Sequence, residues 1–262
     1  MSGSLYARRM NRVALHESAG GSLPPPQLVD AAAAAKFDAV GLRVAAVPTA
    51  EEWWTKGAGS AVIGALIDRL LVTRTAVLDV GRVPLDAGLH RADYREVHSR
   101  VLDLGQRLGA QFVTARAGDA AAGELFVQLA ALSKPYQLRP LLAAVPGTAV
   151  PDLDAALAVV SGSRGGVVLD LQLSPGAIED VDTLVARAGD HLGYVRLDAA
   201  ELASAPDGAL ATLPQHVPVA VGAREGGAAV AADNPTAHAV QLRRAVDRLL
   251  EHPRARAARL GY

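Results

Sequence analysis

The stretch Gly165-Gly-Val-Val-Leu-Asp-Leu-Gln-Leu-Ser-Pro-Gly176 decides the fold class of this chain. Two glycines open it, and the apolar run at 167–169 leads to an acid, Asp170. A short apolar run bounded by turn residues is typical of a strand that is buried on both faces, as in parallel sheets. A carboxylate at the end of such a strand costs free energy unless another group pairs with it. The stretch therefore predicts a buried parallel strand whose terminal acid needs a partner.

Seven other short strand-like runs alternate with helical patterns along the chain. With the opening stretch as the sixth, strands are expected at residues 13–16, 39–44, 75–80, 112–116, 137–143, 194–197 and 217–221. Helices are expected at 27–36, 61–71, 94–108, 120–132, 152–160, 178–188 and 235–252, with 202–213 irregular or briefly helical. Eight strands alternating with helices at a spacing of about 30 residues predict an α/β fold, the (β/α)8 TIM barrel.

The predicted barrel is a single domain over residues 13–262, preceded by a mobile N-terminal arm at 1–12. An open doubly wound sheet is the alternative fold. Its dinucleotide-binding form is disfavoured, because no G-x-G-x-x-G motif follows the first strand. Pro140 is unfavourable in the fifth strand, since proline removes one hydrogen-bond donor from the sheet.

Composition narrows the class of protein. The chain has 262 residues, a formal net charge of -1 and no cysteine, which excludes disulfides and thiolate chemistry. No block of basic residues predicts nucleic-acid binding, and no run of about 18 apolar residues predicts a membrane span. The N-terminus has Arg8 and Arg9 but no apolar segment of a signal peptide. A soluble cytoplasmic protein is expected, and a homo-oligomer is left open.

Ionisable or polar side chains stand at nearly every predicted strand end. The chemistry of such barrels sits at the C-terminal ends of the strands. The side chains at these ends are His16, Glu17, Arg43, Asp79, Arg82, Arg116, Asp119, Asp170, Gln172, Arg196, Asp198, Arg224 and Glu225. A group of guanidinium side chains at one mouth favours an anionic ligand, a carboxylate or a phosphate. The alternative is that these arginines pair with neighbouring loop acids.

Residues 13–250 resemble the sugar phosphate isomerase/epimerase superfamily of xylose-isomerase-like barrels. The matching segments are Lys36-Phe-Asp-Ala-Val-Gly-Leu-Arg43, Val77-Leu-Asp-Val80, Leu108-Gly-Ala-Gln-Phe-Val113, Leu141-Leu-Ala-Ala-Val-Pro-Gly-Thr148, Val168-Leu-Asp170 and Tyr194-Val-Arg-Leu-Asp-Ala199. The resemblance covers nearly the whole chain and implies the same barrel. Its motifs are short, so the resemblance implies a reaction class more weakly than it implies the fold.

The resemblance also implies a divalent metal site, which this chain matches in part. Family members hold the metal with acids after strands five, six and eight and a His or Gln in strand seven. Asp170 matches the sixth-strand acid and Glu225 the eighth-strand acid. The fifth-strand acid falls on Ala143, or on Ala144 with a one-residue slip. The seventh-strand ligand falls on Arg196 and an accessory substrate-binding His on Leu173. Two of the four ligand positions are therefore retained.

A cation at the seventh-strand position changes the expected chemistry. A guanidinium offers no metal ligand and repels a divalent ion, but its fork can bind carboxylates. We expect Arg196 to pair with Asp170 and Glu225 in the place of the metal, so that no cofactor is needed. If the degenerate site still binds Mn²⁺, Mg²⁺ or Zn²⁺, Asp170 and Glu225 are its ligands. The alternative is that Arg196 points outward into solvent.

The leading functional hypothesis is an isomerase or epimerase acting on a small anionic hydroxy-carbonyl compound. Its catalytic residues would be Asp170, Glu225, Arg196 and His16, with substrate binding by Arg43, Arg82, Arg116, Arg224 and Gln172. Trp53 and Trp54 could cap an apolar ligand or pack elsewhere. The rivals are a non-catalytic barrel that binds a small anion or a partner, and a metal-free lyase such as a dehydratase or cyclase. The sequence leaves enzyme and non-enzyme open.

Overall fold

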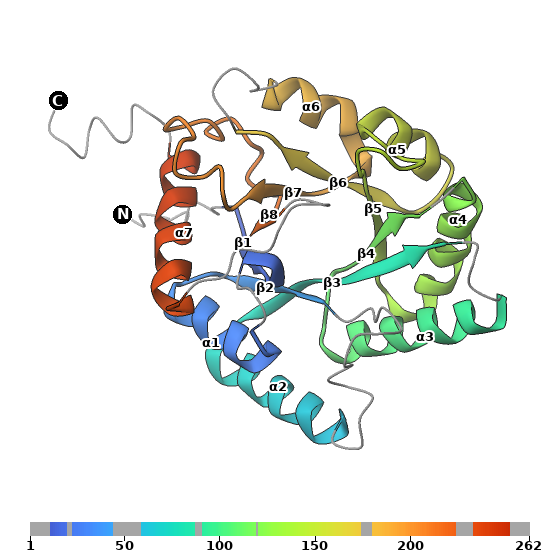
Figure 1. The fold of residues 1–262 in the computed structure, drawn as a ribbon, viewed down its shortest axis with the longest axis horizontal. Helices are drawn as coiled ribbons and strands as arrows, with labels where there is room; N and C mark the ends of the chain where they lie inside the picture. Colours follow the sequence, from blue (N-terminus) through green and yellow to red (C-terminus); the bar gives the residue numbers. More distant parts are fainter. Residues whose placement is uncertain are drawn as a thin grey trace, which may run out of the picture.

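The chain folds into a closed barrel of eight parallel strands in the order β1 to β8. The structure is a computed structural model and describes residues 11–19, 23–43, 59–86, 91–118, 120–173, 180–223 and 233–251. Helices pack around the outside of the barrel (Figure 1). The predicted single-domain (β/α)8 architecture is confirmed.

The strands and helices alternate as the sequence predicts. The strands are β1 (Val13–His16), β2 (Ala39–Arg43), β3 (Ala76–Leu85), β4 (Phe112–Ala117), β5 (Arg139–Ala143), β6 (Gly166–Leu171), β7 (Leu192–Asp198) and β8 (Val219–Gly222). The helices are α1 (Pro25–Ala34), α2 (Gly59–Thr73), α3 (Arg91–Arg107), α4 (Ala122–Ser133), α5 (Leu153–Val160), α6 (Val181–Ala188) and α7 (Pro235–Leu250). Short 3-10 turns are η1 (Glu17–Ala19), η2 (Lys134–Tyr136) and η3 (Gly189–His191).

Strand β3 is longer than the sequence predicts. The expected strand stops at residue 80, but the observed one runs to Leu85 and contains Arg82, which had been expected in the following loop. The register between β3 and β4 shifts between Val80 and Val83, after which Leu85 pairs with Ala117. The shift absorbs the extra residues, so the strand continues past the point where its apolar run ends.

Two apolar layers hold the barrel together. The larger layer lies between the strands and the surrounding helices and includes Leu66, Phe126 and Leu242. The smaller layer lies inside the barrel and includes Phe112, Leu141 and Tyr194. Because side chains alternate between the two faces of a strand, the outward-facing residues build the first layer and the inward-facing ones build the second.

A polar layer lies inside the barrel, one step toward the C-terminal ends of the strands. Two residues beyond the apolar lumen residues Ala14, Phe112, Val168 and Tyr194, the strands carry His16, Thr114, Asp170 and Arg196. Alternation directs these side chains into the same lumen. The fold therefore gathers polar groups from β1, β4, β6 and β7 above an apolar floor, where such barrels carry their chemistry.

The described part of the N-terminal segment is fixed to the barrel. The amide of Asn11 donates to the carbonyls of Pro214 and Val217, and the N–H of Val219 donates to the carbonyl of Arg12. The remainder of the predicted mobile arm, residues 1–10, lies outside the described residues. Among the described helices, none has the length and apolar content needed to cross a membrane.

Candidate active site

Asp170 and Arg196 form a two-point ion pair inside the barrel. They are register partners on adjacent strands β6 and β7, which places their side chains next to each other in the lumen. Nε of Arg196 lies 2.5 Å from Oδ1 of Asp170, and Nη2 lies 2.7 Å from Oδ2. The Arg196 side chain is 1% exposed, whereas the Asp170 side chain is 21% exposed. The guanidinium is buried, and the carboxylate it binds remains reachable from the mouth.

Asp79 is the second carboxylate of the lumen and is fully buried. Its Oδ2 accepts hydrogen bonds from the hydroxyls of Thr114 and Tyr194, each at 3.2 Å. Among the described residues, Oδ1 has no hydrogen-bond partner. Burial raises the pKa of Asp79 to about 6, while the charge of Arg196 and both hydrogen bonds act in the opposite direction. A carboxyl of this kind changes its protonation near neutral pH.

His16 links Asp79 to the β8 side of the lumen. Its Nδ1 lies 2.9 Å from the Ser18 hydroxyl and accepts from the Ser18 backbone N–H at 3.4 Å. Because Nδ1 accepts that N–H, we assign the ring proton to Nε2, which lies 3.8 Å from Oδ2 of Asp79. Burial lowers the pKa of His16 well below its usual value, and the charges of three arginines lower it further: Arg196, Arg82 and Arg43. The imidazole is therefore neutral and directs its N–H toward Asp79.

A serine, a histidine and an aspartate lie in series here, as in a nucleophilic triad: Ser18, His16 and Asp79. The Ser18 hydroxyl, however, is not placed to act as a nucleophile. The Ser18 hydroxyl is buried and already accepts the backbone N–H of Ala223 at 2.9 Å. A Cβ on Gly222 would lie 2.5 Å from the same oxygen, so no space for a substrate carbonyl remains beside it. The chain of contacts holds His16 in place and does not present a nucleophile.

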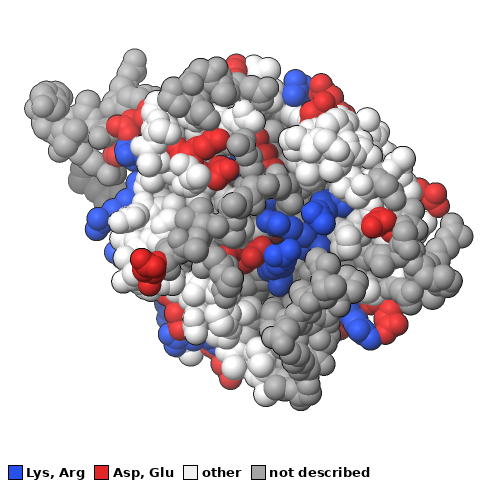
Figure 2. All heavy atoms as spheres, viewed as in Figure 1, with Lys and Arg blue, Asp and Glu red and all other residues white. Residues whose placement is uncertain are grey.

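The mouth of the barrel carries further arginines. Arg82 is half-buried and lies 4.0 Å from Glu17, whereas Arg43 and Arg116 are exposed at the ends of β2 and β4. The strands run anticlockwise in Figure 1, so right-handed crossovers place their C-terminal ends toward the viewer. Figure 2, seen from the same side, shows Lys and Arg side chains gathered near the middle of this face, with acidic side chains beside them.

Several predicted site residues can now be placed. The structure brings together Asp170, Arg196 and His16 in the lumen, with Arg82 at its edge. Gln172 is exposed just beyond β6. The residues that the structure does not describe include two predicted for the site, Arg224 and Glu225, and the tryptophans of the second loop, Trp53 and Trp54. The predicted pairing of Arg196 with Asp170 is observed, and its pairing with Glu225 lies outside the described residues.

Sequence reasoning missed part of the buried network. The sequence pattern predicts Tyr194 and Thr114 as strand residues with no special role. It predicts Asp79 only as one of several ionisable side chains at the strand ends. One signal was available in the sequence, namely Gly41 in the middle of β2. A Cβ on Gly41 would lie 2.4 Å from Oδ1 of Asp79 and 2.5 Å from Cδ2 of His16. A glycine inside a strand often marks such a close approach.

Comparisons with known proteins agree on the architecture. No family model matches the sequence, and no curated protein matches it. A xylose isomerase-like TIM barrel/4-hydroxyphenylpyruvate dioxygenase fusion protein matches with a TM-score of 0.70 and 17% identity, over 96% of this chain and 44% of that one. The D-allulose 3-epimerase of Methylomonas sp. matches with a TM-score of 0.66 and 14% identity, over 92% of this chain and 98% of that one.

A zinc-bound IolI protein matches equally well, with a TM-score of 0.66 and 14% identity over 91% of this chain and 98% of that one. This chain shares the (β/α)8 barrel fold of these proteins. The identities are low, so the likeness shows the fold alone.

The residues of this barrel do not fit a divalent metal in the described part of its lumen. Both oxygens of Asp170 are bonded to the guanidinium of Arg196, which repels a divalent cation. Ala143, at the position where the family resemblance places an acid, is a buried methyl group. Among the described residues, no three His, Asp or Glu side chains are grouped closely enough to hold a metal ion.

Proposed function

We propose that this barrel is a metal-independent isomerase or epimerase acting on a small anionic hydroxy-carbonyl compound of the sugar type. The observation that carries the proposal is the Asp170–Arg196 pair, because it joins a reachable carboxylate to a buried, fixed cation. Supporting it, two proteins of the same fold are sugar epimerases, the D-allulose 3-epimerase and the 3-keto-D-glucoside 4-epimerase of E. coli.

The proposed reaction moves a proton next to a carbonyl group. Asp170 removes a proton from the carbon beside the carbonyl, and the electron pair of that C–H bond moves onto the carbonyl oxygen as an enediolate forms. Arg196 stabilises the negative charge that develops on this oxygen, the role that a metal ion plays in other enzymes. Delivery of the proton to the former carbonyl carbon, together with transfer of the hydroxyl proton from the neighbouring oxygen to the former carbonyl oxygen, completes an isomerisation.

An epimerisation needs a second acid on the opposite side of the substrate. Glu225 is our candidate for this role, and Arg224 is a candidate for substrate binding beside it. The exposed Arg43 and Arg116, the half-buried Arg82 and the exposed Gln172 would bind the anionic end and hydroxyls of the substrate. The role of His16 would be indirect. Its N–H is directed at the buried carboxyl of Asp79, so His16 would influence the proton transfer only through that carboxyl.

A second candidate function is a barrel that binds a small anion without turnover. It is favoured by Leu173, which is fully buried and apolar where the family resemblance places a substrate-binding His, and by Ala143. A metal-free lyase would share the first proton removal with the leading proposal, so an assay of that step covers both enzymatic readings.

Deuterium exchange tests the proposal without knowledge of the product. The protein would be incubated in D₂O with a panel of aldoses, ketoses, their phosphates and hydroxy-keto acids, and exchange at the carbon beside the carbonyl followed by proton NMR. We expect exchange with at least one anionic compound, lost at least a hundredfold in Asp170→Asn. Asp103→Asn, an exposed aspartate on α3, is the matched control and should keep full exchange. Binding of an anion without exchange in any compound would favour the non-catalytic barrel.

A further inference from the structure

A small pocket lies on the face of the barrel opposite the candidate active site. It is formed by the end of α4, η2, the start of β5 and the turn before β6, and its volume is about 130 Å³. We call it the Arg164 pocket. Its lining residues are Ala130, Ser133, Lys134, Gln137, Leu138, Arg139, Pro140 and Arg164. Typical small-molecule sites are roughly 300 Å³ or larger, so this pocket suits a ligand of a few heavy atoms.

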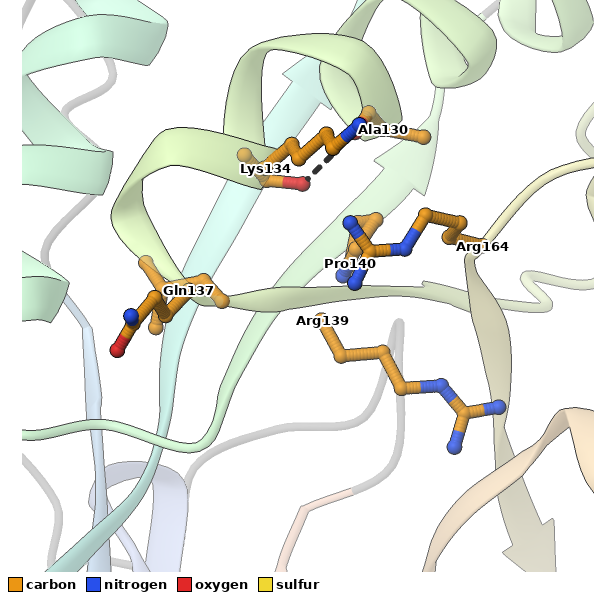
Figure 3. Close-up of a pocket in the computed structure, with 8 residues that line it drawn as sticks. Ala130, Lys134, Gln137, Arg139, Pro140 and Arg164 are labelled. Carbon is orange, nitrogen blue, oxygen red and sulfur yellow. Dashed lines mark hydrogen bonds between the residues drawn. The ribbon is translucent and has the colours of Figure 1, made fainter.

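The charged side chains that line the pocket are all positive. Three of its lining side chains are cationic, Lys134, Arg139 and Arg164, and none of the described residues that line it carries a carboxylate. Figure 3 shows the side chain of Arg164 reaching from its turn toward Pro140, between the end of α4 and β5. Cationic side chains gathered in a concavity attract an anion more strongly than the same charges do on an open surface.

Arg139 is fixed beside the pocket and adds a permanent positive charge. Its Nη2 donates to the carbonyl of Asp190 at 2.6 Å and its Nη1 to the carbonyl of Leu192 at 3.3 Å. Burial lowers the pKa of Arg139, and the nearby Asp190 carboxylate opposes this shift. Within the described chain its hydrogen bonds go to neutral carbonyls, so the cost of burying the cation is offset only in part.

The start of β6 is shaped to accept this guanidinium. A Cβ on Gly166 would lie 2.7 Å from Nη2 of Arg139 and 2.2 Å from the carbonyl oxygen of His191. The glycine therefore leaves the space in which Arg139 reaches the η3 and β7 carbonyls. The position of the cation is set by the fold and does not depend on a ligand.

We propose that the Arg164 pocket binds a small tetrahedral oxyanion, of which free inorganic phosphate is the probe of choice. Lys134 and Arg164 donate to the anion directly, and Arg139 stabilises it through its fixed charge. A fork-shaped guanidinium and a mobile ammonium together suit the several acceptor oxygens of phosphate. The ligand of this pocket is separate from the substrate of the barrel mouth, because the pocket lies beside the N-terminal ends of β5 and β6 and the mouth lies at the C-terminal ends of the strands.

Phosphate binding at constant ionic strength tests the proposal. Isothermal titration would be carried out on the full chain, on Lys134→Gln combined with Arg164→Gln, and on the control pair Lys36→Gln with Arg244→Gln. The control removes the same two charges from exposed positions elsewhere. We expect millimolar or tighter binding by the full chain and by the control, and at least tenfold weaker binding by the pocket variant.

The mouth arginines are a competing site for the same anion and need their own variant. Arg43→Gln combined with Arg116→Gln leaves the Arg164 pocket intact, so this variant should retain the phosphate that the pocket variant loses. Loss of binding in the mouth variant and full binding in the pocket variant would overturn the proposal. So would the absence of millimolar binding by the full chain. Both exposed pocket residues are replaced by glutamine, and circular dichroism would verify that each variant is folded.

Discussion

Arg196 carries a positive charge in a place where charge is costly. A buried guanidinium must be paired and hydrogen-bonded, and Asp170 supplies both through two short N–H···O contacts. The pairing could be expected from the sequence, because the two residues stand at matching depths of neighbouring predicted strands. The barrel thus places a fixed cation in the lumen without relying on a bound ion.

Asp79 is the other residue on which the lumen depends, and its folded-state pKa lies above its ordinary value of 3.8. Between about pH 4 and pH 6 the folded chain binds a proton at Asp79 that the unfolded chain does not. The free energy of unfolding contributed by this group therefore falls as the pH rises through this window. A shift of about two pKa units corresponds to roughly 3 kcal/mol.

The replacement Asp79→Asn should remove this pH dependence. We expect the unfolding free energy of the wild-type chain, relative to the variant, to rise by roughly 2 kcal/mol between pH 7 and pH 4, since asparagine binds no proton and the unfolded aspartate is itself partly protonated at pH 4. Urea unfolding at several pH values measures both curves, and the histidine contributions common to both chains cancel in the difference. Asp103→Asn should run parallel to wild type. Parallel curves for Asp79→Asn would show that Asp79 is already ionised at pH 4.

At the scale of elements, the strands decide which side chains enter the lumen. Register shifts occur between Val40 and Gly41 on β2, between Val80 and Val83 on β3, and between Val167 and Val168 on β6. A shift of one residue moves the following side chains to the other face of a strand. The sequence shows where apolar runs start and stop but not these shifts. Sequence reasoning identified Asp170 and Arg196, because the β6 shift comes before them and the pairing from Val168 onward is regular. It missed the network around Asp79, which lies next to the shifts on β2 and β3.

The glycine of β2 should be required for this arrangement. Gly41→Ala places a Cβ against Asp79 and His16, and overpacking of this kind costs about 1–3 kcal/mol. Urea unfolding should show that loss. Gly64→Ala on α2 is the matched control, because nothing lies within 4 Å of its added Cβ and alanine favours a helix. The control should be unchanged or more stable by up to about 1 kcal/mol. Equal stability of Gly41→Ala and wild type would mean that the lumen has room for the added methyl group beside Asp79 and His16.

At the scale of the whole molecule, the fold was predictable because its signal repeats. Each of eight strand patterns is followed by a helix or an irregular return segment, and a closed parallel barrel is the arrangement that buries every such strand on both faces. A wrong boundary in one element, such as β3, leaves this pattern intact. The site has no such redundancy, because it depends on single residues from several strands, and Glu225, which is predicted to complete it, is outside the described residues.

In the mechanism that we propose, a guanidinium replaces a divalent metal in a barrel that moves protons. The most direct measurement combines elemental analysis of protein purified without chelator with the deuterium-exchange assay before and after EDTA treatment. We expect less than about a tenth of an equivalent of Mn, Zn, Mg, Fe or Co per chain, and the same exchange rate with and without EDTA. One tightly bound metal ion per chain, with exchange that EDTA abolishes and the metal restores, would contradict it.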